Sequence, residues 1–144
     1  MSVLWFDGLL TQVEDAGIYF LPDDDIEELL EAAAVNRFPC VRIDLRDCAD
    51  KAELLQRIGA ALNFPPHVAH NFDALADALG DLRVPRLPGL VVLLENTERL
   101  RRHAVADFKT TMEVLQGASR EWAKHDQPFW AFVALDDAEF AGLG

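Results

Sequence analysis

The sequence lacks long apolar runs and a signal-peptide pattern, and it has few cysteines. No apolar run approaches the roughly 18–20 residues that a membrane-spanning helix needs. The first residues carry no basic segment ahead of an apolar stretch and reach an acid at Asp7, so we expect no signal peptide. Cys40 and Cys48 are too few for a disulfide framework, and we expect free thiols, with Cys40 buried in a strand. These absences predict a protein that works in the reducing cytoplasm.

Motifs of the common catalytic sites are also missing. The sequence has no glycine-rich phosphate loop and no Gly-x-Ser-x-Gly turn, and neither cysteine has an obvious base beside it. The histidines follow no recognised catalytic spacing; they are His67, His70, His103 and His125. We therefore expect a protein that is not an enzyme and that needs no cofactor.

Positive charge is scarce as well. The 144 residues include 13 Lys and Arg against 25 Asp and Glu, which gives a net charge of −12. Phosphate backbones repel such a chain, and this argues against nucleic acid as a partner. An acidic surface favours basic partners, because opposite electric fields accelerate association. Acidity also raises solubility, so only the positions of the acids can show whether a partner is involved.

The hydrophobic pattern predicts an α/β domain. Three apolar runs are typical of core strands: residues 40–45, 90–94 and 129–135. Helical spacing predicts helices over about 50–62, 71–82 and 98–124, the last with a bend near Gly117. Parallel neighbours need crossover connections, so strands that alternate with helices predict a three-stranded parallel sheet packed with helices.

Residues 1–38 precede this core and predict an extension of the sheet. Residues 3–6 and 18–21 are short apolar runs, which we expect to form a hairpin or two short edge strands. Pro22 and the acids at 23–25 then begin a helix, whose dipole favours negative charge in the first turn. We expect one compact domain in which residues 1–38 pack on a core of residues 39–144.

A short helix in the middle of the chain carries the clearest functional signal. Asn71 fits an N-cap, and at about 100° per residue Asp73, Asp77 and Asp81 gather opposite the apolar arc. His70 projects to the same side if the turn before the helix is itself helical. Like charges four residues apart destabilise a helix, and this stretch has no lysine or arginine to neutralise them. The pattern indicates either a solvated face or a surface that meets a basic partner.

The residues around this helix form a longer pattern. A helix end at Leu62, a proline at Pro65 and a loop lead into Asn71-Phe72-Asp73-Ala74-Leu75-Ala76-Asp77-Ala78-Leu79. This run resembles the signature of the barstar family, the intracellular inhibitors of barnase-type ribonucleases. The order of elements between about residues 50 and 135 fits that family too. The resemblance implies a barstar-like fold, extended at its N-terminus by one or two short strands and a helix.

The same resemblance implies a function. The acidic helix and the loop before it would plug the active site of a basic ribonuclease or a similar toxin protein, with Asp73 and Asp77 in place of substrate phosphates. The chain would then be an antitoxin or immunity protein, and a monomer when free because inhibition needs the acidic face exposed. The partner-binding residues that it implies are His67, Val68, His70, Asn71, Asp73, Ala74, Asp77 and Asp81, with Glu121 the nearest candidate for a distal acidic contact.

The chain departs from the family pattern in two places. At residues 67–70 the family usually has aromatic residues, a glycine and often an acid, and at Ala76 it often has tryptophan. The acidic pair is intact, but the loop that shapes the interface differs. An immunity or interaction protein for a partner other than a ribonuclease therefore stays open.

A metal site is another alternative. His67, His70, Asp73 and Asp77 supply two imidazoles and two carboxylates within three turns, and such groups bind zinc or manganese. The proline pair at 65–66 makes the placement of the histidines uncertain from sequence, so the alternative depends on geometry.

Overall fold

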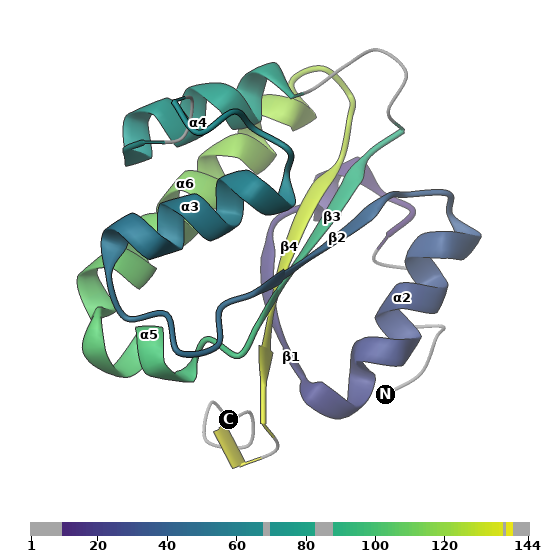
Figure 1. The fold of residues 1–144 in the computed structure, drawn as a ribbon. Helices are drawn as coiled ribbons and strands as arrows, with labels where there is room; N and C mark the ends of the chain where they lie inside the picture. Colours follow the sequence, from purple (N-terminus) through teal and green to yellow (C-terminus); the bar gives the residue numbers. More distant parts are fainter. Residues whose placement is uncertain (1–9, 68–69, 83–87, 137, 140–144) are drawn as a thin grey trace.

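The computed structural model describes residues 10–67, 70–82, 88–136 and 138–139 (Figure 1). These residues form a parallel four-stranded sheet in the order β1-β4-β3-β2. The strands are β1 Ile18–Pro22, β2 Cys40–Asp44, β3 Leu90–Glu95 and β4 Phe129–Leu135. The predicted α/β core is confirmed, as is its extension by an N-terminal strand and helix. The other expected N-terminal strand, residues 3–6, lies outside the described residues.

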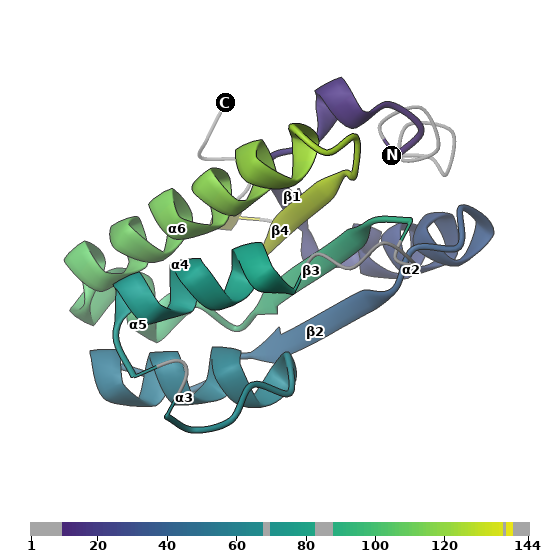
Figure 2. The same ribbon diagram turned by 90° about the horizontal axis from the view of Figure 1, so that it is seen from above.

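Helices cover both faces of the sheet (Figures 1 and 2). On one face lie α3 Lys51–Ala61, α4 Phe72–Asp81, α5 Glu98–His103 and α6 Val105–Ala123; on the other lies α2 Ile26–Val35. Short 3-10 turns, η1 Val13–Asp15 and η2 Asp23–Asp25, flank β1. No helix in the described part of the chain combines the length and apolar character that crossing a bilayer requires.

The direction of the crossovers explains why the helices divide between the two faces. From β1 the chain crosses the whole sheet through α2 to β2, and from β2 it returns through β3 to β4. Parallel crossovers are right-handed, so connections that move in opposite directions along a sheet must cover opposite faces. α2 therefore lies alone on one face, and the helices of the return path share the other.

The two faces bury separate halves of the core. Side chains alternate along each strand, so Val92 and Val133 point toward α3–α6, while Val91 and Phe132 point toward α2. The N-terminal segment completes the second half with a set of buried side chains: Leu10, Leu21, Leu29, Ala32 and Ala33. The residues that precede β2 thus cover the face of the sheet on the side of α2, which would otherwise be exposed to water.

One expectation about the helices is wrong. The chain does not form a single helix over 98–124 bent near Gly117; it breaks at Ala104, whose φ of −138° and ψ of 54° are not helical. Gly117 lies inside an uninterrupted α6. The turn at Ala104 lets Leu100 of α5 and Phe108 of α6 both pack on the core. Because neither proline nor glycine marks this break, the hydrophobic spacing alone does not show it.

Candidate protein-binding surface

The acidic helix α4 lies between α3 and α6 in the outer layer (Figure 2). The N-cap predicted at Asn71 is confirmed: its Oδ1 accepts a hydrogen bond from the backbone N–H of Ala74 at 2.7 Å. The extended backbone of Asn71, with φ of −150° and ψ of 172°, ends the preceding loop. The cap fixes where the helix begins, and this places Asp73 in its first turn.

The buried side of α4 is tied to the core. Leu75 and Leu79 are fully buried, and the indole Nε1 of Trp122 donates a hydrogen bond to the carbonyl oxygen of Leu79 at 3.0 Å. Carbonyls in the last turn of a helix have no partner within the helix, so Trp122 satisfies one of them from α6. These contacts fix how α4 is rotated on the core.

The opposite side of α4 presents three carboxylates. Asp73, Asp77 and Asp81 are all exposed, as their spacing predicts. Within the described residues, none of them has a hydrogen-bond or ion-pair partner. The structure therefore shows negative charge on a well-anchored helix, and no cation of the described residues pairs with it.

The loop before α4 has its own geometry. Nδ1 of His70 lies 2.9 Å from the carbonyl oxygen of His67, and both histidines are exposed. Val68 lies outside the described residues. A hollow of about 400 Å³ beside the loop is lined by α3, Phe64, Pro65, Pro66 and His70. Proline and phenylalanine thus give this side of the loop an apolar surface.

Glu121 lies on α6, across a groove from Asp77. The groove has a volume of about 410 Å³ and runs between α4 and α6. Glu121 is half-buried and pairs with Lys124 at 3.4 Å and with His125 at 3.8 Å. The structure therefore brings Asp77 and Glu121 to one groove, whereas Asp81 is not among the residues that line it.

Other residues of this groove were not predicted from the sequence. Glu113 lines it from α6, and Gly80 and Gly117 lie on its two sides. A signal was present, because residues 113, 117 and 121 are four apart and so share one face of a helix. The sequence does not show that Gly80 of α4 lines the same groove, because this depends on how the two helices pack together.

The structure does not bring the proposed metal ligands together. Among the described residues, three or more metal-ligating side chains gather within 4.8 Å only at Glu98, Asp136 and Glu139. The set His67, His70, Asp73 and Asp77 is therefore not assembled as a site. The zinc or manganese alternative thus gains no support from the geometry.

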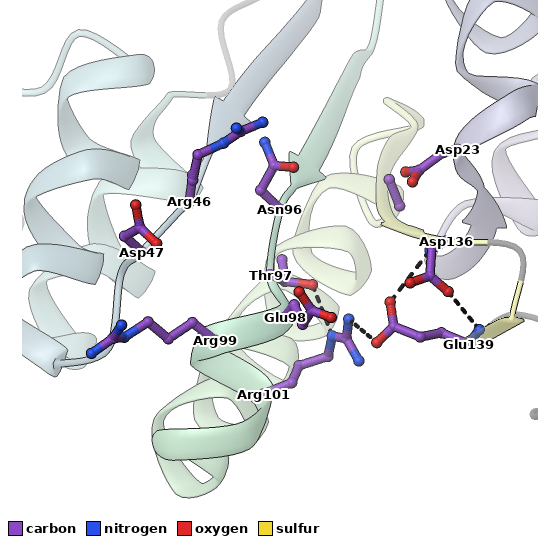
Figure 3. Close-up of a pocket in the computed structure, with 11 residues that line it drawn as sticks. Asp23, Arg46, Asp47, Asn96, Thr97, Glu98, Arg99, Arg101, Asp136 and Glu139 are labelled. Atoms are coloured by element: carbon purple, nitrogen blue, oxygen red, sulfur yellow. Dashed lines mark hydrogen bonds and ion pairs between the residues drawn. The ribbon is translucent and has the colours of Figure 1, made fainter.

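The Glu98 cluster lies in a separate polar cavity of about 500 Å³ (Figure 3). This cavity opens where the carboxyl ends of the four strands meet. Figure 3 shows the guanidinium of Arg101 between Thr97 and Glu139: Nη2 donates to Glu139 at 2.6 Å, and Nε donates to Thr97 at 2.9 Å. A cation of the chain itself therefore already compensates part of the acidic cluster.

Neither cysteine offers a nucleophile. Both thiols are free. Burial raises the pKa of Cys40 to about 11 and also raises the pKa of Cys48 above its usual value. Both groups stay protonated near neutral pH, so neither supplies a thiolate for catalysis.

The parallel sheet, its layer of helices and the exposed acidic helix define a small α/β domain with a surface suited to contact with another protein. A comparison with family models then gives the family. Residues 38–134, more than half of the chain, match Barstar, described as barstar (barnase inhibitor), so the chain belongs to the barstar family. Members of this family are inhibitors of an enzyme and not enzymes themselves. No curated protein matches the chain.

Proposed function

We propose that this protein inhibits a barnase-like ribonuclease by covering its basic active site with α4 and the loop before it. One observation carries the proposal: Asp73 and Asp77 are exposed, have no partner among the described residues, and lie on a capped helix in a barstar-family chain. A ribonuclease active site binds phosphates through cationic side chains, and carboxylates accept hydrogen bonds from the same groups. The inhibitor would thus occupy the place of the substrate.

The anchoring of α4 supports a tight complex. Asn71 fixes the start of the helix, and Trp122 fixes its end against α6. A surface that is already ordered loses less conformational entropy on binding, so more of the contact energy appears as affinity. The net charge of −12 adds attraction at long range toward a basic enzyme. Barnase and barstar are themselves a standard example of such electrostatic steering.

We further propose that the remaining predicted residues form the edge of this interface. Asp81, the last residue of α4, would lie at the far end of that edge. Asn71 and Ala74 lie in the first turn beside Asp73, and His67, Val68 and His70 precede it in the chain. Glu121 would contribute from α6. The inhibitor would act as a monomer in the cytoplasm, where Cys40 and Cys48 stay reduced.

The loop supports a second candidate. His67 and His70 occupy positions where the family usually has an aromatic residue and often an acid, so the surface around the acidic pair differs from the family pattern. An immunity protein against a basic toxin that is not a ribonuclease would keep the acids and change the loop. This candidate needs the same acidic helix but a different enzyme.

An inhibition assay separates the two candidates. The protein is titrated against each basic ribonuclease and each other basic toxin of its native organism, with RNA cleavage or the toxin's own activity as the readout. We expect complete inhibition of one ribonuclease at about equal molar amounts. Inhibition of another toxin alone would establish the second candidate, and no inhibition of any would refute both.

A further inference from the structure

The polar cavity at the carboxyl ends of the strands lies at a special point of the sheet. All four strands lead into it: Asp23 follows β1, Arg46 follows β2, Asn96 follows β3 and Asp136 follows β4. The connection from β1 covers one face of the sheet and the connection from β3 covers the other, and β4 lies between these two strands. Where connections part in this way, open α/β sheets have a crevice in which small molecules bind. The volume of about 500 Å³ is that of a small-molecule site.

Thr97 lines this cavity with a buried hydroxyl group that has a hydrogen atom to donate. The residue is 1% exposed, and its Oγ1 accepts a hydrogen bond from Nε of Arg101 at 2.9 Å. Thr97 is the N-cap of α5, but its side chain makes no capping bond. No acceptor for its hydroxyl hydrogen is found among the residues that the structure describes. A buried donor without an acceptor costs free energy, so Thr97 indicates a ligand that brings an acceptor oxygen.

Three carboxylates in the same cavity have the spacing of acceptors around an ammonium group. One oxygen from each of Glu98, Asp136 and Glu139 lies within 4.8 Å of the other two. An ammonium has three N–H donors, and acceptors about 2.8 Å from its nitrogen lie about 4.6 Å apart. A divalent metal ion fits less well, because Nη2 of Arg101 already lies 2.6 Å from Glu139. That guanidinium repels a double charge twice as strongly as a single one.

The hydroxyl and the carboxylates are close enough for one small molecule to reach both. The guanidinium of Arg101 bonds to Thr97 through Nε and to Glu139 through Nη2 (Figure 3). The two groups are therefore separated by no more than the width of one guanidinium and two hydrogen bonds. An α-amino acid carries its ammonium and its carboxylate on the same carbon atom, so it fits this spacing.

The other side of the cavity is basic. Arg46 and Arg99 line it, on the side away from Asp136 and Glu139 (Figure 3). Neither guanidinium has an ion-pair partner within the described part of the chain, although acids outnumber bases in the sequence. Two such arginines suit a second carboxylate on the ligand, because guanidinium and carboxylate form paired, charge-assisted hydrogen bonds.

We infer that this cavity binds a free α-amino acid with an acidic side chain. Its ammonium is held by the three carboxylates, and its α-carboxylate accepts the hydrogen bond that Thr97 has to donate. Its side-chain carboxylate lies toward Arg46 and Arg99. The site is separate from the surface proposed to bind a ribonuclease, because neither Asp73 nor Asp77 lines it.

A titration with defined probes tests the site. L-glutamate is added to ¹⁵N-labelled full-length protein at constant pH and ionic strength, with two comparisons: N-acetyl-L-glutamate lacks the ammonium, and L-lysine reverses the side-chain charge. We expect saturable shifts of the amide signals of Thr97 and Arg101 with L-glutamate, and binding about tenfold weaker or worse for each comparison. No saturable shift with L-glutamate, or equal binding of either comparison, would overturn the inference. Saturation by calcium chloride in place of L-glutamate would also overturn it.

Matched variants then test individual contacts. Thr97→Val removes the hydroxyl group at nearly unchanged shape, whereas Thr97→Ser keeps it. We expect Thr97→Val to weaken the binding of L-glutamate about tenfold and Thr97→Ser less than about threefold. Equal binding by these two variants would contradict the role of the hydroxyl.

A second pair of variants needs no change to a buried residue. Arg99→Gln removes a cation that lines the cavity, and Arg120→Gln removes an exposed arginine of α6 that does not. We expect about tenfold weaker binding of L-glutamate in the first and no change in the second. Equal affinities would overturn the inference even if Thr97→Val fails to fold. None of these results bears on Asp73 or Asp77, so their failure would leave the proposed function standing.

Discussion

The indole N–H of Trp122 donates a hydrogen bond to the carbonyl oxygen of Leu79 at 3.0 Å, and both residues are fully buried. This bond joins the long helix α6 to the end of the acidic helix α4. It satisfies a backbone carbonyl that the helix itself leaves without a partner. The orientation of Asp73 and Asp77 therefore depends on a tryptophan that lies far from them in sequence.

Trp122→Phe tests this bond. The variant keeps an aromatic ring but leaves the Leu79 carbonyl buried without its donor. Trp130→Phe is the matched control, because Trp130 is equally buried and its Nε1 has no hydrogen-bond partner among the residues that the structure describes. We expect Trp122→Phe to lower the free energy of unfolding by about 1–3 kcal/mol more than Trp130→Phe does, as measured by urea denaturation. Equal losses would show that the bond adds nothing to stability.

The N-cap at Asn71 gives a second prediction. Asn71→Ala removes the acceptor for the Ala74 N–H, and we expect it to destabilise the protein by about 1 kcal/mol. Asn71→Asp retains a capping oxygen and should stay close to wild type. Amide exchange of the first turn of α4 should accelerate in the alanine variant alone. Unchanged exchange at Ala74 in Asn71→Ala would contradict the role of the cap.

The N-terminal segment gives a third prediction. Residues 1–38 include β1, which pairs with β4, and α2, which covers one face of the sheet. Deleting them would expose Trp130 and Phe132, so we expect the fragment 39–144 to lose cooperative unfolding and to bind a dye for exposed apolar surface. A fragment with native near-ultraviolet circular dichroism and a sharp melting transition would show that the core folds without the extension.

Ionic strength gives a fourth prediction. The net charge of −12 attracts a basic partner, and salt screens that attraction over about 10 Å at 0.1 M. We expect the association rate constant to fall at least tenfold between 20 mM and 500 mM salt, with a smaller change in the dissociation rate constant. Surface plasmon resonance or stopped-flow kinetics would measure both rate constants. An association rate that does not respond to salt would contradict electrostatic steering.

Local signals in the sequence predicted much of the fold. The apolar runs gave β2, β3 and β4, and the residue type and place of Asn71 gave the cap of α4. The outward direction of Asp73, Asp77 and Asp81 followed from helical spacing, because their positions lie opposite the residues that pack on the core.

Other features depend on contacts between distant segments. The spacing of residues 18–21 does not show that they pair in parallel with β4, since that pairing joins segments over 100 residues apart. The break at Ala104 has no glycine or proline to mark it. The groove is lined by Gly80 of α4 and Gly117 of α6, and no single helix pattern shows that these two residues come together.

The proposed inhibition depends above all on Asp77, which we expect to bind a cation of the partner enzyme. The most direct test is the dissociation constant of Asp77→Ala for the enzyme that the wild-type protein inhibits. Glu31→Ala is the control, because Glu31 is an exposed acid on α2, on the opposite face of the sheet, and its loss changes the net charge equally. We predict that Asp77→Ala raises the dissociation constant at least 30-fold, about 2 kcal/mol, and that Glu31→Ala changes it less than threefold. Equal, small effects of the two variants would contradict a direct contact between Asp77 and the enzyme.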